Sequence, residues 1–328
     1  MLVPLGGRWP LAPNLTVVQD TATSQARFTT SEIGAAPRTR SKAAAYISLT
    51  KPRIIELLLI TTVPTMILAK RGLPSIWLMV ATVVGGTLAA GGANAINMYI
   101  DRDIDRLMHR TQGRPLVTGE IQPLPALVFA LLIEAAAFAW LWGFVNLLSA
   151  VLGLAACLFY VFVYTLWLKR TSTQNIVIGG AAGAVPALVG WSAVTNSLAW
   201  SPVVLFAIIF YWTPPHFWAL AIKYRDDYAA AEVPMLPVVV GLSKTAYRIL
   251  GYTVLLWALT LALAPIANLG VIYVVTATLL GAGFVVLSCQ LIRTPTPKQA
   301  MRMFSFSITY LTVLFVAIAA DQLIGSIG

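Results

Sequence analysis

Three oxygen-bearing side chains recur at every fourth position in the stretch NAINMYIDRDIDRLMHR, residues 94–110. They belong to Asn97, Asp101 and Asp105, and on a helix this spacing places them along one face, with Asp103 turned away. Carboxylate and amide oxygens are hard ligands that suit Mg²⁺, which often completes its shell with phosphate oxygens. The stretch therefore predicts a site for a magnesium-bound phosphate or diphosphate.

A second acidic stretch, IKYRDDYAAAEVPMLP (residues 222–237), carries Asp226 and Asp227. Only one of two adjacent side chains normally faces a site, because neighbouring side chains point in different directions. If the two stretches face each other, they could hold more than one Mg²⁺ around a diphosphate. The alternative is that these acids form solvated salt bridges with the neighbouring arginines.

Composition indicates that these acids belong to a membrane protein. Of the 328 residues, 59% are hydrophobic and 10% are charged, and the mean hydropathy is +0.81. A soluble protein carries about 25% charged residues, and a chain of this length cannot hide so much apolar surface in its own core. Cys157 and Cys289 lie in apolar runs, which favours packing roles over a disulfide or a thiolate metal site.

Nine apolar segments have about the length that crosses a bilayer, although the first is somewhat short. Each should be a helix, because lipid cannot satisfy the polar groups of an open backbone. The sequence therefore predicts an all-α, polytopic membrane protein with nine transmembrane helices. The predicted spans are 54–69, 76–99, 123–141, 144–168, 175–194, 198–221, 246–266, 269–292 and 304–324.

The basic residues predict the orientation of these spans. They gather before the first span and in alternate loops, and only Lys70 and Arg71 fall on the other side. The positive-inside rule then predicts a cytoplasmic N-terminus, cytoplasmic acidic loops and an external C-terminus in the cell membrane. This asymmetry accounts for most of the net charge of +10, and we find no nucleic-acid-binding motif.

Residues 1–43 differ in character from the rest of the chain. They are rich in Thr, Ser, Ala, Pro and Arg and contain no continuous apolar core after a basic start. We therefore expect no signal peptide, and we predict a disordered cytoplasmic extension followed by one membrane domain over residues 44–328.

The motifs together resemble the UbiA superfamily of intramembrane prenyltransferases, and within it most closely the branch of haem O synthases. The signature N-x-x-x-D-x-x-x-D matches Asn97, Asp101 and Asp105 within the stretch 97–119. Four further stretches match in order along the chain. They are LTKPRIIELLLITTVP (49–64), YTLWLKRTSTQNIVIGGAAGAVPALVGW (164–191), TPPHFWALAIKYRDDYAAAEVPMLPVVVG (213–241) and FSFSITYLTVLFVAIAAD (304–321).

Three positions depart from the pattern of the superfamily. Lys223 stands where a second motif, D-x-x-x-D, has its first aspartate, which leaves Asp227 as the matching carboxylate and is typical of the haem branch. Glu232 stands where glycine is expected before VPMLP, and Ala187 stands where a second proline is usual. Neither of the last two changes removes a predicted ligand.

The resemblance implies transfer of a farnesyl group from farnesyl diphosphate to a vinyl group of haem B, with addition of water, to give haem O and diphosphate. It implies Mg²⁺ as the cofactor, the lipid bilayer as the environment, and haem A synthase or a terminal oxidase assembly factor as partners. The implied metal ligands are Asn97, Asp101, Asp105 and Asp227, with Asp226 as a weaker candidate. The implied catalytic residues are Asp101, Asp105, Tyr164 and Lys169.

Cations directed at the leaving diphosphate would stabilise its developing charge. The predicted diphosphate-binding residues are Lys51, Arg53, Arg102, Arg110, Arg114, Lys169, Arg170 and Lys223, and the alternative for each is a topology signal or a lipid contact. Tyr164 could stabilise an allylic cation by cation–π attraction, worth about 1–2 kcal/mol in a dry site. An interfacial tyrosine of the aromatic belt is the alternative.

His216 and Trp212 are the predicted haem contacts. His216 follows Pro214 and Pro215, which free backbone carbonyls and indicate a bend beside a cavity. A histidine among aromatic residues could ligate haem iron or contact the porphyrin, and a hydrogen bond between helices is the alternative. Two charges inside spans, Glu56 and Glu134, are left without a role.

Two function classes remain open on the residues alone. The first is an intramembrane prenyltransferase, with haem as acceptor or, as the runner-up, a quinone precursor or a chlorophyll-like ring. The second is a transporter or channel. The acidic clusters on one membrane face argue against the second class, because a transport path needs polar groups through the midplane, and the sequence has no obvious halves.

Overall fold

The computed structural model of the chain describes residues 40–325, apart from the side chains of residues 53–59. Nearly all of the predicted N-terminal extension and the side chains of Arg53 and Glu56 therefore lie outside the described residues. The described part is helical, with no strand in residues 40–325. This confirms the predicted all-α class.

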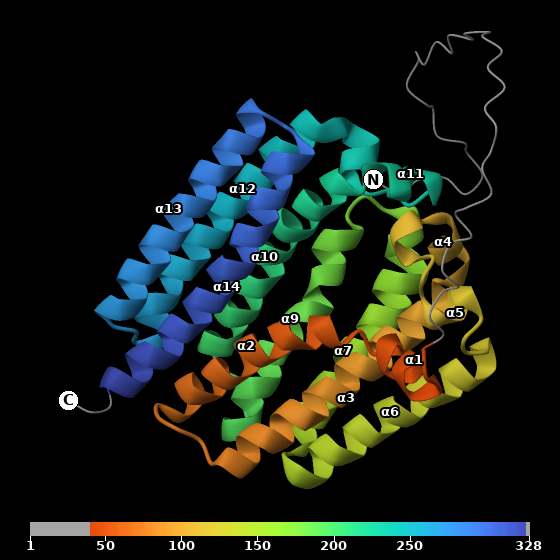
Figure 1. The fold of residues 1–328 in the computed structure, drawn as a ribbon. Coiled ribbons are helices and arrows are strands. Elements are labelled where there is room, and N and C mark those ends of the chain that lie inside the picture. Colours follow the sequence, from red (N-terminus) through yellow and green to blue (C-terminus); the bar gives the residue numbers. More distant parts are fainter. Residues whose placement is uncertain (1–39, 326–328) are drawn as a thin grey trace, which may run out of the picture.

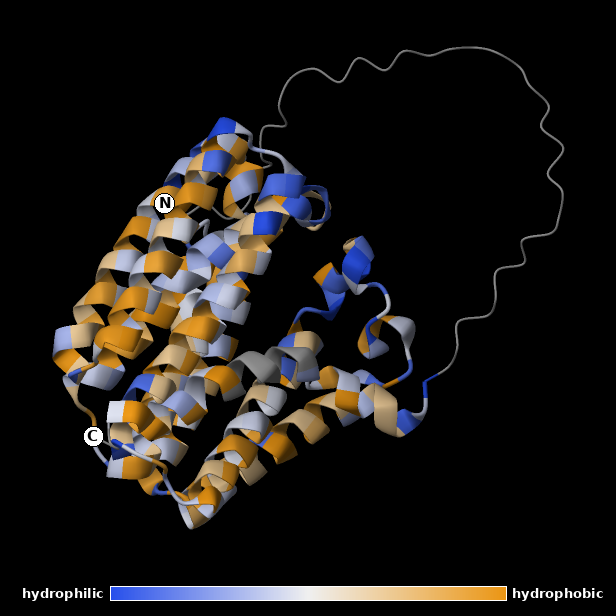
Figure 2. Cartoon of the chain, turned by 60° about the vertical axis from the view of Figure 1, so that its left-hand side comes forward, coloured by the Kyte–Doolittle hydropathy of each residue, from blue (hydrophilic) through white to orange (hydrophobic). Residues whose placement is uncertain are grey.

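Each of the nine predicted spans corresponds to a long helix. In the described part of the chain, eight of these helices are long and apolar enough to cross a membrane, and the ninth, α2, is only partly described. Figure 2 shows apolar ribbon along most of their length. The helices are α2 (Pro52–Lys70), α3 (Ile76–Ile100), α6 (Pro123–Phe144), α7 (Leu147–Leu158) continued by η2 (Phe159–Leu168) and α8 (Lys169–Thr171), α9 (Asn175–Thr195), α10 (Trp200–Lys223), α12 (Leu236–Ala267), α13 (Val271–Arg293) and α14 (Pro297–Gly325).

The long helices pack as a bundle in which chain neighbours are usually spatial neighbours (Figure 1). Helix α3 packs on α6, and α9 packs on α2, α7 and α10. Helix α10 also packs on α12 and α14, while α14 returns to contact α2. The bundle therefore joins its last helix to its first long one.

Short helices connect the spans at one end of the bundle. They are α1 (Lys42–Leu49), α4 (Arg102–Leu107), η1 (His109–Thr111), α5 (Pro115–Thr118) and α11 (Arg225–Ala230). Helices α4 and α5 follow α3, and α11 follows α10, so both acidic stretches of the sequence lie in these connections (Figure 1).

A carboxylate stabilises the C-terminal helices at the end of the bundle opposite the short helices. Asp321 of α14 accepts hydrogen bonds from the backbone N–H groups of Gly270 (2.6 Å) and Tyr273 (3.3 Å) at the start of α13. These donors have no partner within their own helix, so Asp321 caps α13 from a neighbouring helix. Nearby, Tyr273 donates to the Thr260 carbonyl oxygen of α12 at 2.8 Å. The cap and this bond join α12, α13 and α14.

Two residues with positive φ set the entry into α12. Gly241 (φ 82°) breaks α12 between its first turns and its long apolar part. Glu232 has φ 52° in the turn between α11 and α12. A residue other than glycine is strained in this left-handed region by about 1–2 kcal/mol. The glycine expected here from the family pattern therefore has a physical reason.

We predict that Glu232→Gly stabilises the protein by about 0.5–1 kcal/mol, because relief of the strain exceeds the entropy cost of glycine. The matched control is Ala229→Gly, an exposed position in α11 with ordinary helical φ, which should destabilise by about 1 kcal/mol. Thermal unfolding of the detergent-purified protein measures both effects. Destabilisation by both substitutions would show that no strain is relieved at Glu232.

Candidate active site

A cavity of about 390 Å³ lies among α2, α3, α7, η2, α9 and α10. Its walls carry many small residues, including Ala89 and Ala93 on α3 and Gly179 and Gly183 on α9. Small side chains leave space between helices that larger ones would fill. Its charged members Lys51, Arg110, Arg114 and Lys169, together with Asn97, come from the helix ends and connections on the acidic side. The cavity is therefore apolar inside and charged at one end.

The first acidic stretch lies at this charged end. Helix α3 ends at Ile100 and α4 begins at Arg102, so the chain bends at Asp101. The fourfold spacing survives the bend, because Asp101 N–H donates to the Asn97 carbonyl and Asp105 N–H to the Asp101 carbonyl, both at 2.9 Å. Asp101 and Asp105 are completely buried, whereas the Asp103 side chain is 59% exposed. The face predicted from spacing is the buried one.

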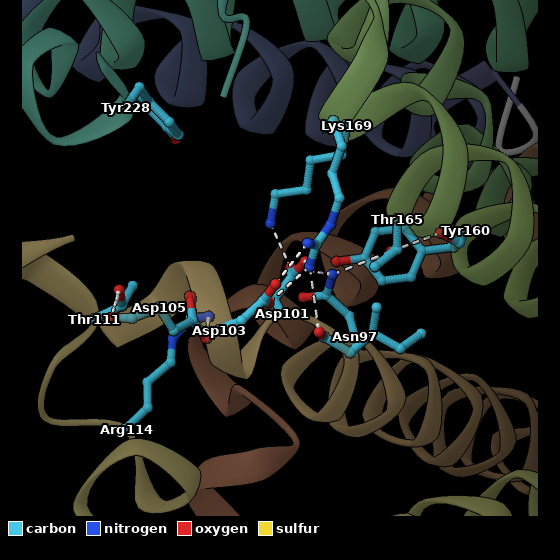
Figure 3. Close-up of polar contacts among 12 residues, drawn as sticks. Asn97, Asp101, Asp103, Asp105, Thr111, Arg114, Tyr160, Thr165, Lys169 and Tyr228 are labelled. Atoms are coloured by element: carbon cyan, nitrogen blue, oxygen red, sulfur yellow. Dashed lines mark hydrogen bonds and ion pairs between the residues drawn. The ribbon is translucent and has the colours of Figure 1, made fainter. Parts of the chain in front are cut away.

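Partly buried cations compensate these carboxylates (Figure 3). Lys169 forms an ion pair with Asp101, and Arg114 forms one with Asp105. Asn97 donates from Nδ2 to Asp101 Oδ2 at 2.7 Å and accepts from Lys51 Nζ at 2.8 Å. A buried charge without a partner is very costly, so each carboxylate requires its cation.

Burial and neighbouring charges shift the pKa of Lys51. Burial, and then the charges of Arg114 and Lys169, lower the pKa of Lys51 to about 7. An anion entering the cavity mouth would therefore meet cations that already repel one another. This arrangement favours binding of a multiply charged anion such as a diphosphate.

A π-helix positions the aromatic and basic residues of the fourth span. In η2 the Lys169 N–H donates to the carbonyl of Tyr164, five residues earlier. Thr165 Oγ1 likewise donates to the Tyr160 carbonyl at 2.8 Å and accepts from Asn97 Nδ2 at 3.1 Å. In an α-helix, residues five apart would be separated by about 140° around the axis. The wider π turn lets Tyr164 and Lys169 both line the cavity.

The oxygens left over at this site are suitable for a metal ion. Asp101 Oδ1 and Asp105 Oδ1 are buried and have no hydrogen-bond partner. Two free carboxylate oxygens next to an anion-binding cluster suit Mg²⁺, which needs few protein ligands when phosphate completes its shell. Within the described residues, however, no three His, Cys, Asp or Glu side chains lie close enough to form a complete metal site. The Asn97 amide oxygen already accepts from Lys51.

The second acidic stretch touches the first through Arg110. The Arg110 N–H donates to Asp227 Oδ2 at 3.3 Å, and its guanidinium donates to the Tyr228 hydroxyl at 2.9 Å. Asp226 and Lys223 are exposed, and the Lys223 ammonium lies 5.2 Å from the Tyr224 ring. The two acidic stretches are therefore in contact, and Arg110 lies between Asp227 and the acids of the first stretch.

The UbiA prenyltransferase family model matches residues 58–315 of the chain. The chain belongs to this family. Curated relatives named protoheme IX farnesyltransferase match it over nearly their full length. The protein of Clavibacter michiganensis subsp. michiganensis is 52% identical over 303 residues, which cover 92% of this chain and 98% of the relative. That of Frankia casuarinae is 55% identical over 288 residues, covering 87% and 99%.

Solved structures of UbiA proteins share the fold. A digeranylgeranylglyceryl phosphate synthase aligns with a TM-score of 0.72 at 17% identity, covering 86% of this chain and 99% of that one. A UbiA homolog from Archaeoglobus fulgidus bound to DMAPP and Mg²⁺ aligns with a TM-score of 0.58 at 18% identity, covering 84% and 99%. At this identity the likeness concerns the fold.

Three of the predicted diphosphate ligands of this UbiA protein lie outside the cavity, namely Arg102, Arg170 and the exposed Lys223. Arg170 follows Lys169 directly, so its side chain points to another side of the helix and pairs with Asp103 at 2.6 and 2.7 Å. These hydrogen bonds lower the pKa of Asp103 to about 2. Arg102 turns back to donate to the Tyr99 carbonyl at 2.7 Å. Neither arginine lines the cavity, whereas Lys51, Arg110, Arg114 and Lys169 do.

The predicted haem contacts separate in the structure. Trp212 lines the cavity, but His216 does not. The His216 ring is stacked between Trp212 and Phe304, with centroids 4.2 and 4.5 Å away, and its Nδ1 is 2.7 Å from Ser307 Oγ on α14. His216 therefore joins α10 to α14 in this structure, as the alternative interpretation expected.

Sequence reasoning missed Thr165, Tyr160 and Tyr228 of this UbiA site. Thr165 and Tyr160 depend on the π-helix, which α-helical periodicity does not predict. Tyr228 adjoins the predicted Asp227 and also lines the cavity, so its position in the motif was the available signal.

We predict that the Asp101–Lys169 pair is strongly coupled in folding. A double-mutant cycle with Asp101→Ala and Lys169→Met, measured by thermal or denaturant unfolding in detergent, should give a coupling energy of about 3 kcal/mol or more. The control cycle uses Asp103→Ala and Arg170→Met. This pair is partly exposed, so its coupling should stay below about 1 kcal/mol. Equal coupling in the two cycles would contradict the importance of burial.

Two glycines of α9 offer a second matched pair. A Cβ at Gly179 would collide with the Tyr164 ring, whereas one at Gly183 would meet nothing within 4 Å. Gly183→Ala should stabilise the protein by about 1 kcal/mol through helix propensity and should therefore raise the unfolding temperature. Gly179→Ala should destabilise the protein by about 1–3 kcal/mol through overpacking and should therefore lower the unfolding temperature. Similar unfolding temperatures for both variants would mean that Tyr164 does not pack against Gly179.

Proposed function

We propose that this chain transfers a farnesyl group from farnesyl diphosphate to a vinyl group of haem B, with addition of water, to give haem O and diphosphate. The observation that carries the proposal is the cavity with partly buried cations and buried carboxylates at one end and an apolar interior. High identity to relatives named protoheme IX farnesyltransferase supports this choice of donor and acceptor.

The donor fits the cavity in one direction. Its diphosphate would bind at the charged end, among Lys51, Arg114 and Lys169, and its farnesyl chain would lie between the small residues of α3 and α9. Arg110 from the first loop and Tyr228 from the second would close the site, because they are hydrogen-bonded to each other and both line the cavity.

Asp101 and Asp105 would hold Mg²⁺ through their free oxygens. The predicted ligand Asp227 does not complete a three-acid site with them in the described residues and accepts from the Arg110 N–H instead. The bound metal would neutralise charge on the leaving diphosphate. A UbiA homolog bound to DMAPP and Mg²⁺ supports this assignment in a related fold.

The chain's own residues would then guide the reaction. The bond between the first farnesyl carbon and the diphosphate oxygen breaks, and its electron pair leaves with the oxygen, stabilised by Lys169 and Arg114. The rings of Tyr160 and Tyr164, stacked with centroids 5.4 Å apart, lie beside the cavity and stabilise the allylic cation. The vinyl group attacks this cation, water adds to the resulting carbocation, and a proton is released.

The haem acceptor would contact Trp212, the predicted haem contact that lines the cavity. His216 would act by holding Trp212, since their rings are stacked. As an iron ligand, His216 would first have to leave Phe304 and Ser307.

The function is tested by incubating the purified protein with haem B, farnesyl diphosphate and Mg²⁺ and identifying the product by mass spectrometry. We expect the mass of haem plus one farnesyl group and one hydroxyl group. A quinone precursor and a chlorophyll-like ring serve as rival acceptors. Prenylation of a rival without formation of haem O would overturn the acceptor, and no metal-dependent product at all would overturn the reaction.

In this assay Asp101→Asn and Asp105→Asn should each reduce turnover at least a hundredfold, because each removes a charge that holds the metal and the basic residues. Asp103→Asn is the matched control and should have a milder effect, since Asp103 is exposed and pairs with Arg170. Near-normal turnover in both variants would show that Asp101 and Asp105 do not take part in the reaction.

We further propose that the charged end of the cavity faces the cytoplasm. In a Cys157→Ala, Cys289→Ala background, a cysteine at Gln112 should react with an impermeant thiol reagent only from the cytoplasmic side. A cysteine at Gly143, in the last turn of α6, should react from outside. The reverse labelling pattern would place the reaction on the external face.

A further inference from the structure

A second hollow of about 460 Å³ lies next to the site but shares none of its lining with the central cavity. It is a surface groove between the end of α3, α4 and the end of η2. Its lining residues are Ile100, Arg102, Asp103, Arg106, Leu166 and Arg170.

The groove carries an excess of positive charge, since it holds three guanidinium groups and one carboxylate. Asp103 occupies one face of Arg170. Arg102 makes a backbone hydrogen bond and lies 4.5 Å above the Tyr99 ring, which holds it in place without neutralising it. Arg106 is exposed and has no ion-pair partner among the described residues. Each guanidinium has five N–H donors, so several remain for an anionic ligand.

The neighbourhood of the groove shows where its ligand would extend. Phe162, Leu166 and Trp167 of η2 are all about half exposed, at 58%, 48% and 54%. They belong to a helix that crosses the membrane, and they lead away from the groove toward its apolar part. Tryptophan is enriched at the membrane interface, where lipid headgroups lie. A ligand that satisfies both parts has a phosphate head and an apolar tail.

We propose that this groove binds the phosphate headgroup of an anionic phospholipid, with its acyl chains along η2. The headgroup would contact Arg102, Arg106 and the free donors of Arg170, and basic pockets at helix ends are known to suit such lipids. Arg170 also lies 3.9 Å from Asp101. A lipid held there would therefore lie next to the charge network of the central site without entering it.

The test is native mass spectrometry of the full-length, detergent-purified protein titrated with phosphatidylglycerol. The double variant Arg102→Gln, Arg106→Gln should weaken the first lipid-binding constant by about 25-fold, because each basic residue near an anionic lipid contributes about a factor of five. The control variant Arg293→Gln, Lys298→Gln removes two exposed basic residues from another loop and should bind phosphatidylglycerol as the wild type does. Thermal unfolding of both variants checks that the fold is intact.

Two further measurements identify the ligand. Phosphatidylcholine should bind the wild type and the groove variant equally, and millimolar pyrophosphate should not displace phosphatidylglycerol. Equal phosphatidylglycerol binding by wild type and groove variant, or an equal loss in the control variant, would overturn the site. Displacement by pyrophosphate would overturn the assignment to lipid. None of these measurements uses turnover, so their outcome is independent of the proposed reaction.

Discussion

Two fully buried carboxylates set the conditions that the rest of the site has to meet. Asp101 and Asp105 lie where helices end within a chain of very apolar composition. Burying a single uncompensated charge would cost more than a typical protein has in stability. Lys169 and Arg114 are therefore needed by the fold before any ligand arrives. The same cations are then available to a diphosphate, so folding and binding draw on one set of charges.

This requirement explains why several elements converge on a few atoms. The bend at Asp101 keeps the carboxylates at the cavity mouth, and the π-helix returns Lys169 to the same place. Asn97 links the two, since its amide reaches both Asp101 and Thr165. The second loop adds Tyr228 from another part of the chain, and Arg110 of the first loop donates to its hydroxyl. Helix packing alone would not fix these positions, because the walls of the cavity consist largely of small residues.

The sequence predicted the features that depend on composition and simple periodicity. Hydropathy located the nine long helices, and fourfold spacing separated the buried Asp101 and Asp105 from the exposed Asp103. It could not distinguish Lys169 from Arg170, since both are adjacent cations and only the local helix type decides which one faces the cavity. His216 was equally ambiguous. A histidine among aromatic rings fits a ligand site or a packed helix contact, and only the position of α14 separates the two.

The π-helix has a consequence for how the chain can change in evolution. A π-helical stretch holds one more residue than an α-helical stretch that would serve the same contacts. Deleting one residue from Phe159–Leu168 would restore α-helical geometry and remove the five-residue hydrogen bond that brings Tyr164 and Lys169 to the same side. Substitutions within the segment can be accepted one at a time, but a change of length cannot. Alignments of related sequences should therefore show variable residues here and almost no gaps, in contrast to the turns at the far end of the bundle.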